Sequence, residues 1–146
     1  MRSIDPYSYA CGVMDSFNEM LAAGLKPMAM SHPTRNKAER DEWIPPAQTI
    51  CQKYHTRFYV EDEAFLTDLF PLSLNENTFV LVFYRDSEIL ERYLALKEKK
   101  RELIRQKQYR GAARQDIALQ FGILLGYPQG DILRMIQENP QKEPDL

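Results

Sequence analysis

The chain has 146 residues, of which 44% are hydrophobic and 11% aromatic, and this suits one domain with a packed core. A formal net charge of −2 provides no global field for nucleic acid or anionic lipid, and no segment approaches the roughly 20 apolar residues of a membrane span. The N-terminal residues lack the apolar core of a signal peptide. We therefore expect a soluble cytoplasmic protein that binds neither nucleic acid nor membrane.

The first predicted elements are a helix and a short strand. Asp5 can cap the helix and Pro6 suits its first position. Apolar residues then recur at helical spacing, at Ala10, Val13, Met14, Phe17 and Leu21. Gly24 is expected to end this helix, and residues 26–31 predict a strand bounded by proline.

The next part of the chain alternates polar and apolar stretches. Residues 32–43 are polar and predict a loop, and a second helix is expected over 47–55 after two prolines. Residues 57–60 are rich in strand formers, whereas residues 64–70 predict one or two helical turns closed by Pro71.

Residues 78–84 predict the strongest strand. Seven consecutive strand-favouring residues without alternation indicate burial on both faces, as in a central strand. Asp86 or Ser87 can cap a following helix that extends to about residue 109. The middle of that helix, residues 97–102, carries both signs of charge, which is typical of a solvated face.

Residues 112–137 predict two helices joined by Leu-Gly-Tyr-Pro. Gly126 can adopt the left-handed conformation that stops a helix, and Tyr127 is expected to fold back on Phe121. Pro128 suits the start of the next helix, where Asp131 complements the helix dipole. We expect a corner between two core helices.

The alternative for this corner is a DNA-reading helix-turn-helix, which needs positive charge to neutralise phosphates. From Pro128 onward the only bases are Arg134 and Lys142, against four acidic residues. Charge therefore argues against DNA recognition.

The order of elements predicts an α/β fold. We expect a small two-layer or three-layer domain with a short, mainly parallel sheet of about three strands and a C-terminal helical subdomain. The domain is expected to cover residues 1–139, with the strand core to about residue 85 and the helical part over 86–139. Residues 140–146 form a polar stretch that predicts a flexible tail.

Polar groups follow the predicted strands, at Ser31, His32 and Arg35, at residues 61–63, and at Arg85. In a parallel sheet these exits converge, and ligands bind there. Arg35 and Arg85 would hold a carboxylate or phosphate, Ser31 would donate a hydrogen bond, and His32 would be the protonatable group. Each residue also has an ordinary interpretation as a loop or surface group.

The preferred function is therefore binding of a small anionic ligand at the strand exits. One alternative is an enzyme that uses His32 as general acid or base. Another is a scaffold that uses the charged helix, where bases concentrate over residues 97–114, to bind a protein partner or a second copy. No phosphate-binding loop or nucleophile elbow appears, and no cofactor is indicated.

The two cysteines, Cys11 and Cys51, are too few for a dense disulfide framework. Free thiols in a reducing cytoplasm are expected, with a single bridge as the alternative. Zinc-type cysteine spacing is absent and the two histidines lie far apart in sequence, so we expect no metal site.

The second half of the chain resembles a group of small uncharacterised bacterial proteins. Those proteins carry a buried strand ending in Tyr-Arg and, later, a Leu-Gly-Tyr-Pro corner followed by Asp and a hydrophobic residue. The matching residues here are Tyr84, Arg85, Leu125, Gly126, Tyr127, Pro128, Asp131 and Ile132. The resemblance suggests a bacterial source and implies no catalytic residues.

Overall fold

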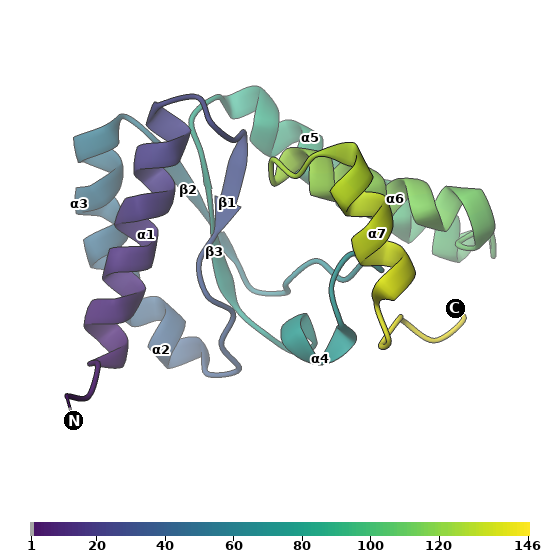
Figure 1. Cartoon of the computed structure of the whole chain (residues 1–146), viewed down its shortest axis with the longest axis horizontal. Coiled ribbons are helices and arrows are strands. Elements are labelled where there is room, and N and C mark those ends of the chain that lie inside the picture. Colours follow the sequence, from purple (N-terminus) through teal and green to yellow (C-terminus); the bar gives the residue numbers. More distant parts are fainter. Residues whose placement is uncertain (1) are drawn as a thin grey trace. The chain divides into compact units, whose positions relative to one another are not determined.

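The computed structural model describes residues 2–146, which form two compact units (Figure 1). Unit 1 comprises the chain up to Ala64 together with Asn77–Ser87, and unit 2 comprises Phe65–Glu76 together with Glu88–Leu146. The helical part expected from about residue 86 corresponds to most of unit 2. Residues 65–76, expected within the strand core, group instead with the C-terminal helices.

Unit 1 contains a three-stranded sheet of β1 (Met28–Met30), β2 (Arg57–Glu61) and β3 (Val80–Tyr84), in the order β1-β3-β2. Both neighbouring pairs are antiparallel. The α/β class is confirmed, but the expected parallel sheet is wrong. β1 and β2 run in the same direction across a helical connection, as in a parallel unit. However, β3 lies between them and runs the opposite way, so no two parallel strands are neighbours.

Two long helices, α1 (Pro6–Ala22) and α3 (Ile44–Tyr54), lie side by side on one face of this sheet (Figure 1). The expected cap of α1 is confirmed, because Asp5 accepts a hydrogen bond from the Ser8 N–H at 3.2 Å. Residues 32–43 are not all loop, since they contain α2 (Lys37–Glu42). The Asn36 side chain caps this short helix by accepting a hydrogen bond from the Glu39 N–H. The helix has no apolar stripe, so a sequence pattern does not reveal it.

The core of unit 1 lies between the helices and the sheet. Its buried residues are Ala10, Met14, Leu21, Ala29, Trp43, Ala47, Ile50, Cys51, Leu81 and Phe83. All five residues of β3 are buried, as expected for a central strand. The run of apolar residues over 80–84 therefore reflects burial on both faces.

Unit 2 contains α4 (Leu72–Asn75), α5 (Ser87–Arg105), α6 (Gly111–Leu124) and α7 (Gln129–Glu138). The helix expected over 64–70 is wrong, because that segment is irregular and a short helix begins only after Pro71. Two aromatic rings of this irregular segment pack against α6. Phe65 and Phe70 pack edge-on against Phe121, with ring centroids 5.1 and 6.2 Å apart. These aromatic contacts join residues 65–76 to α6.

The Leu-Gly-Tyr-Pro corner joins α6 to α7 largely as expected. Gly126 has a φ of 90°, and the Tyr127 N–H donates to the Gly122 carbonyl at 3.1 Å. The ring of Tyr127 packs edge-on against Phe70 at 6.3 Å, although Phe121 was the expected partner. Pro128 caps α7 rather than occupying its first turn.

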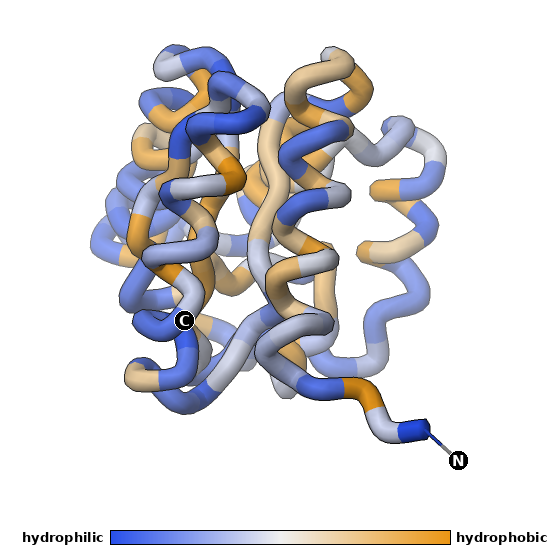
Figure 2. Tube along the Cα trace, turned by 90° about the vertical axis from the view of Figure 1, so that its left-hand side faces the viewer, coloured by the Kyte–Doolittle hydropathy of each residue, from blue (hydrophilic) through white to orange (hydrophobic). Residues whose placement is uncertain are grey.

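Hydrophobic and hydrophilic residues alternate along the helices, as expected for helices with one buried face (Figure 2). Within residues 2–146, none of the helices combines the length and apolar character needed to cross a membrane.

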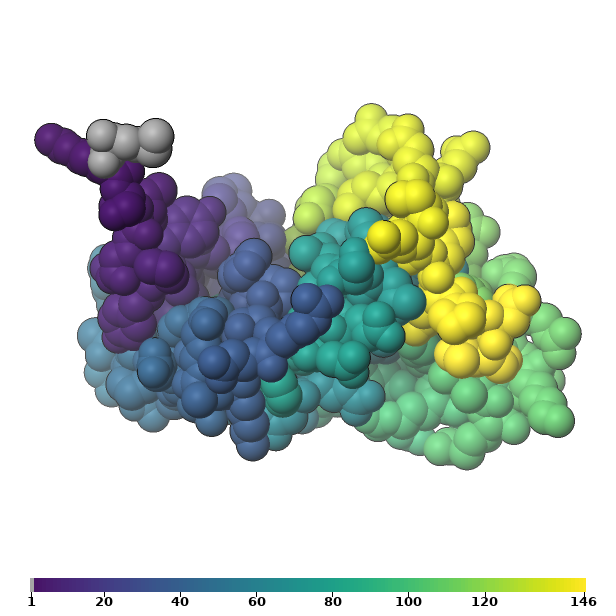
Figure 3. Space-filling model, turned by 90° about the horizontal axis from the view of Figure 1, so that it is seen from below, coloured from purple at the N-terminus to yellow at the C-terminus, as the bar shows by residue number. Residues whose placement is uncertain are grey.

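The last residues have no regular secondary structure, as expected for a tail. However, Glu143 is only 8% exposed and Asn139 is also buried. Residues 139–146, which we call the anchored segment, lie on the surface beside residues 65–76 (Figure 3). A polar composition therefore does not mean that this segment lacks fixed contacts.

Candidate functional site

The predicted site residues at the end of β1 lie at the sheet edge. Ser31 is 3% exposed, and its Oγ accepts the Leu81 N–H at 2.8 Å while its own N–H donates to the Leu81 carbonyl at 2.9 Å. The hydroxyl thus extends the pairing of β1 with β3. His32 and Arg35 are exposed in the connection that leads to α2.

Arg85 lies at the opposite end of the sheet. The register pairs Met28 with Tyr84, so the end of β3 meets the start of β1. Arg85 donates to the Ala22 carbonyl at 3.4 Å and lies 3.7 Å from Asp86. The expected convergence of Arg85 with Ser31 and His32 is therefore wrong, because it required parallel strands.

A different arginine, Arg40, forms hydrogen bonds at the end of the sheet where β2 ends and β3 begins. Arg40 of α2 is 0% exposed, and its Nη1 donates to the carbonyls of Glu61 at 2.8 Å and Val80 at 3.3 Å. Its Nη2 donates to Asp62 Oδ1 at 2.6 Å. Burial lowers the pKa of Arg40, but the hydrogen bonds to Asp62 and Asp41 outweigh burial and raise it. In the sequence nothing distinguishes Arg40 from its charged neighbours.

Unit 2 encloses a second, larger group of ionisable residues. This buried charge cluster consists of Asp68, Lys100, Tyr109, Arg114 and Glu143. Arg114 donates to both oxygens of Asp68, at 2.6 and 3.0 Å. Glu143 accepts from Lys100 Nζ on one oxygen and from the Tyr109 hydroxyl on the other, at 2.9 Å. Two cations therefore meet two carboxylates inside the unit.

The charge cluster shifts the pKa values of its members in directions that follow from these contacts. The hydrogen bond from Arg114 to Asp68 raises the arginine pKa. Burial, followed by the charge of Glu143, raises the pKa of Tyr109 far above its usual value near 10. Among the described residues, no fully buried side-chain polar atom lacks a hydrogen-bond partner. Such clusters are common at functional sites and also serve structural roles.

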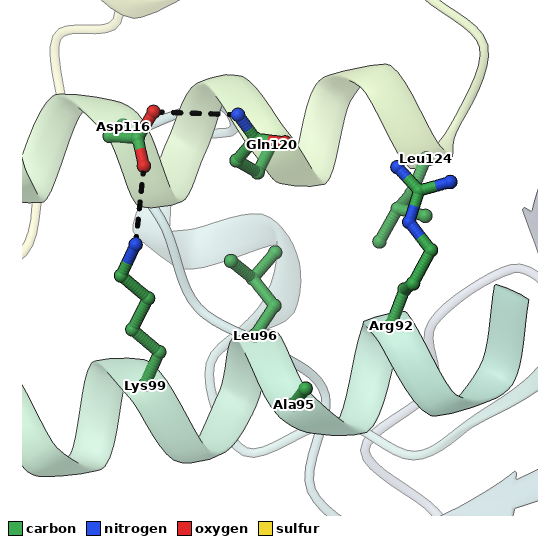
Figure 4. A pocket seen from close by; sticks show the side chains of 7 residues that line it. All are labelled: Arg92, Ala95, Leu96, Lys99, Asp116, Gln120 and Leu124. Atoms are coloured by element: carbon green, nitrogen blue, oxygen red, sulfur yellow. Dashed lines mark hydrogen bonds and ion pairs between the residues drawn. The ribbon is translucent and has the colours of Figure 1, made fainter. Parts of the chain in front are cut away.

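In unit 2, a groove with several polar groups lies between α5 and α6 (Figure 4). Its volume is about 310 Å³, and its lining residues are Arg92, Ala95, Leu96, Lys99, Asp116, Gln120 and Leu124. Figure 4 shows Arg92 reaching from α5 toward Leu124 on α6, at the end of the groove opposite Lys99 and Asp116. Leu96 points into the space between these two ends.

The two ends of the groove differ in how their charges are compensated. Lys99 Nζ lies 3.6 Å from Asp116, which also accepts a hydrogen bond from Gln120 at 3.4 Å. Arg92, by contrast, forms no ion pair with any of the residues that the structure describes. In the sequence, Lys99 is one of the bases of a charged helix and nothing distinguishes Arg92, because helical position alone does not reveal a groove.

Unit 1 has a cavity of about 630 Å³ near the start of β2 that contains a cysteine and a histidine, Cys51 and His55. Burial raises the pKa of the Cys51 thiol, so at neutral pH the sulfur is protonated and unreactive. Nowhere in residues 2–146 do three His, Cys, Asp or Glu side chains gather as a metal ion would require.

Comparison of the chain with protein-family models, with curated proteins and with solved structures finds no match. The resemblance of the Leu-Gly-Tyr-Pro corner to small bacterial proteins therefore stays a prediction, and the functional proposal depends on the geometry.

Proposed function

We propose that the chain binds a small anionic molecule in the groove between α5 and α6. The observation that carries this proposal is Arg92, a guanidinium that is directed across the groove and forms no ion pair with the described residues (Figure 4). A guanidinium forms paired hydrogen bonds with a carboxylate or a phosphate. The class of ligand expected from the sequence is retained, but its site moves from the strand exits to the helices.

Lys99 can supply a second contact to the anion. Its ion pair with Asp116 is long, at 3.6 Å, and both side chains are about half exposed. Exposed pairs of this kind contribute only about 0–1 kcal/mol, so an incoming anion can recruit the ammonium group. With two cations and one carboxylate, the groove carries a net positive charge.

The remaining lining determines the size and shape of the ligand. Ala95, Leu96 and Leu124 provide an apolar wall, and the Gln120 amide provides a further hydrogen-bonding group. A volume of about 310 Å³ lies at the small end of ligand sites. We therefore propose a carboxylate or phosphate ester with a short apolar body.

The scaffold function through the charged helix has less support. On the exposed face of α5, Arg101 pairs with Glu98 at 3.3 Å, and Arg105 pairs with Glu98 and with Glu102. These bases are already compensated within one helix, which leaves little unpaired charge for a partner. Catalysis by His32 has less support as well, because Arg85 lies at the other end of the sheet.

We also propose a cytoplasmic location and a bacterial source. Cys11 and Cys51 are free thiols, which fits a reducing compartment. The bacterial source depends on the resemblance of the Leu-Gly-Tyr-Pro corner.

The proposal can be tested by NMR titration of the full chain with inorganic phosphate and with butyrate. We expect the amide signals of Ala95 and Gln120 to shift, with the apolar tail of butyrate perturbing Leu124. Arg92→Gln should weaken binding at least about tenfold, as the loss of hydrogen bonds to a charged group does. Asp116→Asn should strengthen binding, because it frees Lys99 and removes a negative charge.

The matched control is Arg101→Gln, an exposed arginine on the same helix whose partner is Glu98. This variant should bind both probes like the unmodified chain. Equal weakening by Arg92→Gln and Arg101→Gln would show that net charge alone attracts the anion, and the proposal would then be abandoned. The same holds if neither probe shifts the groove signals.

A further inference from the structure

The main chain of the anchored segment contacts the rest of unit 2 in the way that a bound peptide does. The Gln141 carbonyl accepts the Leu72 N–H at 2.9 Å, and the Glu143 carbonyl accepts Arg114 Nη2 at 2.6 Å. The Glu143 N–H points at Asp68 Oδ1, 3.4 Å away. In extended-peptide recognition, main-chain hydrogen bonds of this kind supply affinity and side-chain pockets supply specificity.

The pocket in this case receives the side chain of Glu143. Its carboxylate meets Lys100 from α5 and the hydroxyl of Tyr109, which precedes α6. Lys100 also donates to the Leu66 carbonyl at 2.7 Å, so the ammonium group is held in place independently of the glutamate. The cradle is thus built by residues outside the anchored segment and is specific for a carboxylate.

The first residue of the anchored segment is fixed by hydrogen bonds from its side chain. Asn139 Nδ2 donates to the carbonyls of Asp68 at 2.9 Å and Phe70 at 3.1 Å. Pro140 follows at once, and Pro144 follows Glu143, and each proline restricts its own backbone conformation. These contacts, rather than helix or strand pairing, hold residues 139–146 on the surface (Figure 3).

The cleft is larger than the anchored segment needs. A cavity of about 480 Å³ adjoins the charge cluster, and its lining includes Asp68, Arg114, Leu133, Ile136 and Lys142. Apolar side chains of α7 and the buried Arg114–Asp68 pair therefore border the same space. A peptide bound in the place of the anchored segment therefore has a cavity beside the charge cluster into which it can direct a side chain.

We propose that this cleft is a binding site for an extended peptide segment that carries a glutamate, and that the anchored segment occupies it as a ligand from the same chain. A short tether gives such a ligand an effective concentration in the millimolar range. A separate peptide therefore competes poorly until the chain's own segment is weakened. The cleft is lined by residues other than those of the anion groove, so its binding of a peptide does not depend on that groove.

The experiment uses the full chain and a fluorescent peptide with the sequence of residues 138–146, monitored by anisotropy. The unmodified chain should bind the peptide only weakly. Glu143→Gln in the chain should strengthen peptide binding at least about tenfold. The chain's own segment then lacks the charged carboxylate that accepts from Lys100 and Tyr109, so the peptide displaces it more easily. Asn139→Ala should act in the same direction while leaving the carboxylate cradle intact.

Two controls separate the proposed site from general attraction. Glu138→Gln makes the same change at an exposed position five residues earlier and should leave peptide binding unaltered. A peptide with glutamine at the position of Glu143 should lose most of the gained affinity. Circular dichroism of each variant establishes that it is folded.

The inference is overturned if folded Glu143→Gln and Asn139→Ala chains bind the peptide no better than the unmodified chain. It is also overturned if the glutamate and glutamine peptides bind equally. If both variants unfold, peptide binding to the unmodified chain is the deciding measurement. Millimolar peptide must then bind to it and be displaced by excess unlabelled glutamate peptide, and absence of such binding overturns the inference.

Discussion

Arg114 holds Asp68 through two hydrogen bonds, from Nε at 2.6 Å and from Nη2 at 3.0 Å, and both side chains are almost fully buried. This pair connects α6 to the irregular segment that precedes α4. A buried pair is weak evidence of stability in itself, because desolvation offsets the attraction. Removing one partner is a different matter, since it leaves an uncompensated charge in the interior.

We therefore expect Asp68→Asn to lower the free energy of unfolding by about 3 kcal/mol, measured by urea denaturation. The matched control is Asp145→Asn. Asp145 lies 3.7 Å from Arg114 Nη1 but is fully exposed, so its substitution should cause no measurable change. Equal effects of the two substitutions would contradict a special role for the buried partner.

The raised pKa of Tyr109 predicts a loss of stability at alkaline pH. Unfolded tyrosine releases its proton near pH 10, whereas burial and Glu143 keep Tyr109 protonated in the folded chain. Its contribution is thus fully present below about pH 10 and is lost as the pH rises further, by up to about 1.4 kcal/mol per pH unit. Tyr109→Phe should remove this part of the slope, whereas Tyr9→Phe, at an exposed position, should not. Urea midpoints between about pH 8 and pH 11 test this.

Local sequence signals predicted several elements because each depends on its own residues. The apolar stripe and Asp5 cap of α1, the uninterrupted apolar run of β3 and the glycine stop at Gly126 are encoded within one segment. Strand order is not encoded in this way. Whether β3 pairs beside β1 and β2 or inserts between them depends on contacts between segments distant in sequence, so the antiparallel pairing was missed.

The same limit applies to the sites. In the sequence, Arg40 and Arg114 look like the exposed bases around them, yet both are buried by segments far away in the chain. Glu143 lies in a polar stretch that predicts flexibility, and only the cradle around Lys100 and Tyr109 explains its burial. Sequence patterns indicate which residues carry charge, but the fold decides which charges meet.

Arg40→Met tests the role of this buried arginine in unit 1. The methionine fills much of the same volume but cannot donate to the carbonyls of Glu61 and Val80. A buried acceptor left without a donor costs about 1–3 kcal/mol, so we expect a loss of roughly 3 kcal/mol in urea denaturation. Arg35→Met, in the exposed connection, serves as the control and should have little effect. A near-neutral Arg40→Met would mean that water can replace the guanidinium there.

We expect replacement of glycine by alanine to destabilise the protein at Gly122 in α6 and to stabilise it at Gly12 in α1. A Cβ at Gly122 would lie 2.7 and 2.8 Å from Cγ1 and Cδ1 of Ile132, so alanine forces the buried Ile132 side chain or the helices α6 and α7 to shift. The expected cost of about 1–3 kcal/mol exceeds the intrinsic helical preference for alanine. At Gly12 in α1 no atom lies within 4 Å of the added Cβ, and Gly12→Ala should raise the melting temperature. Ile132→Val removes Cδ1 and should rescue part of the Gly122→Ala loss in a double-mutant cycle. Additive effects of these two changes would show that the helices do not meet at this point.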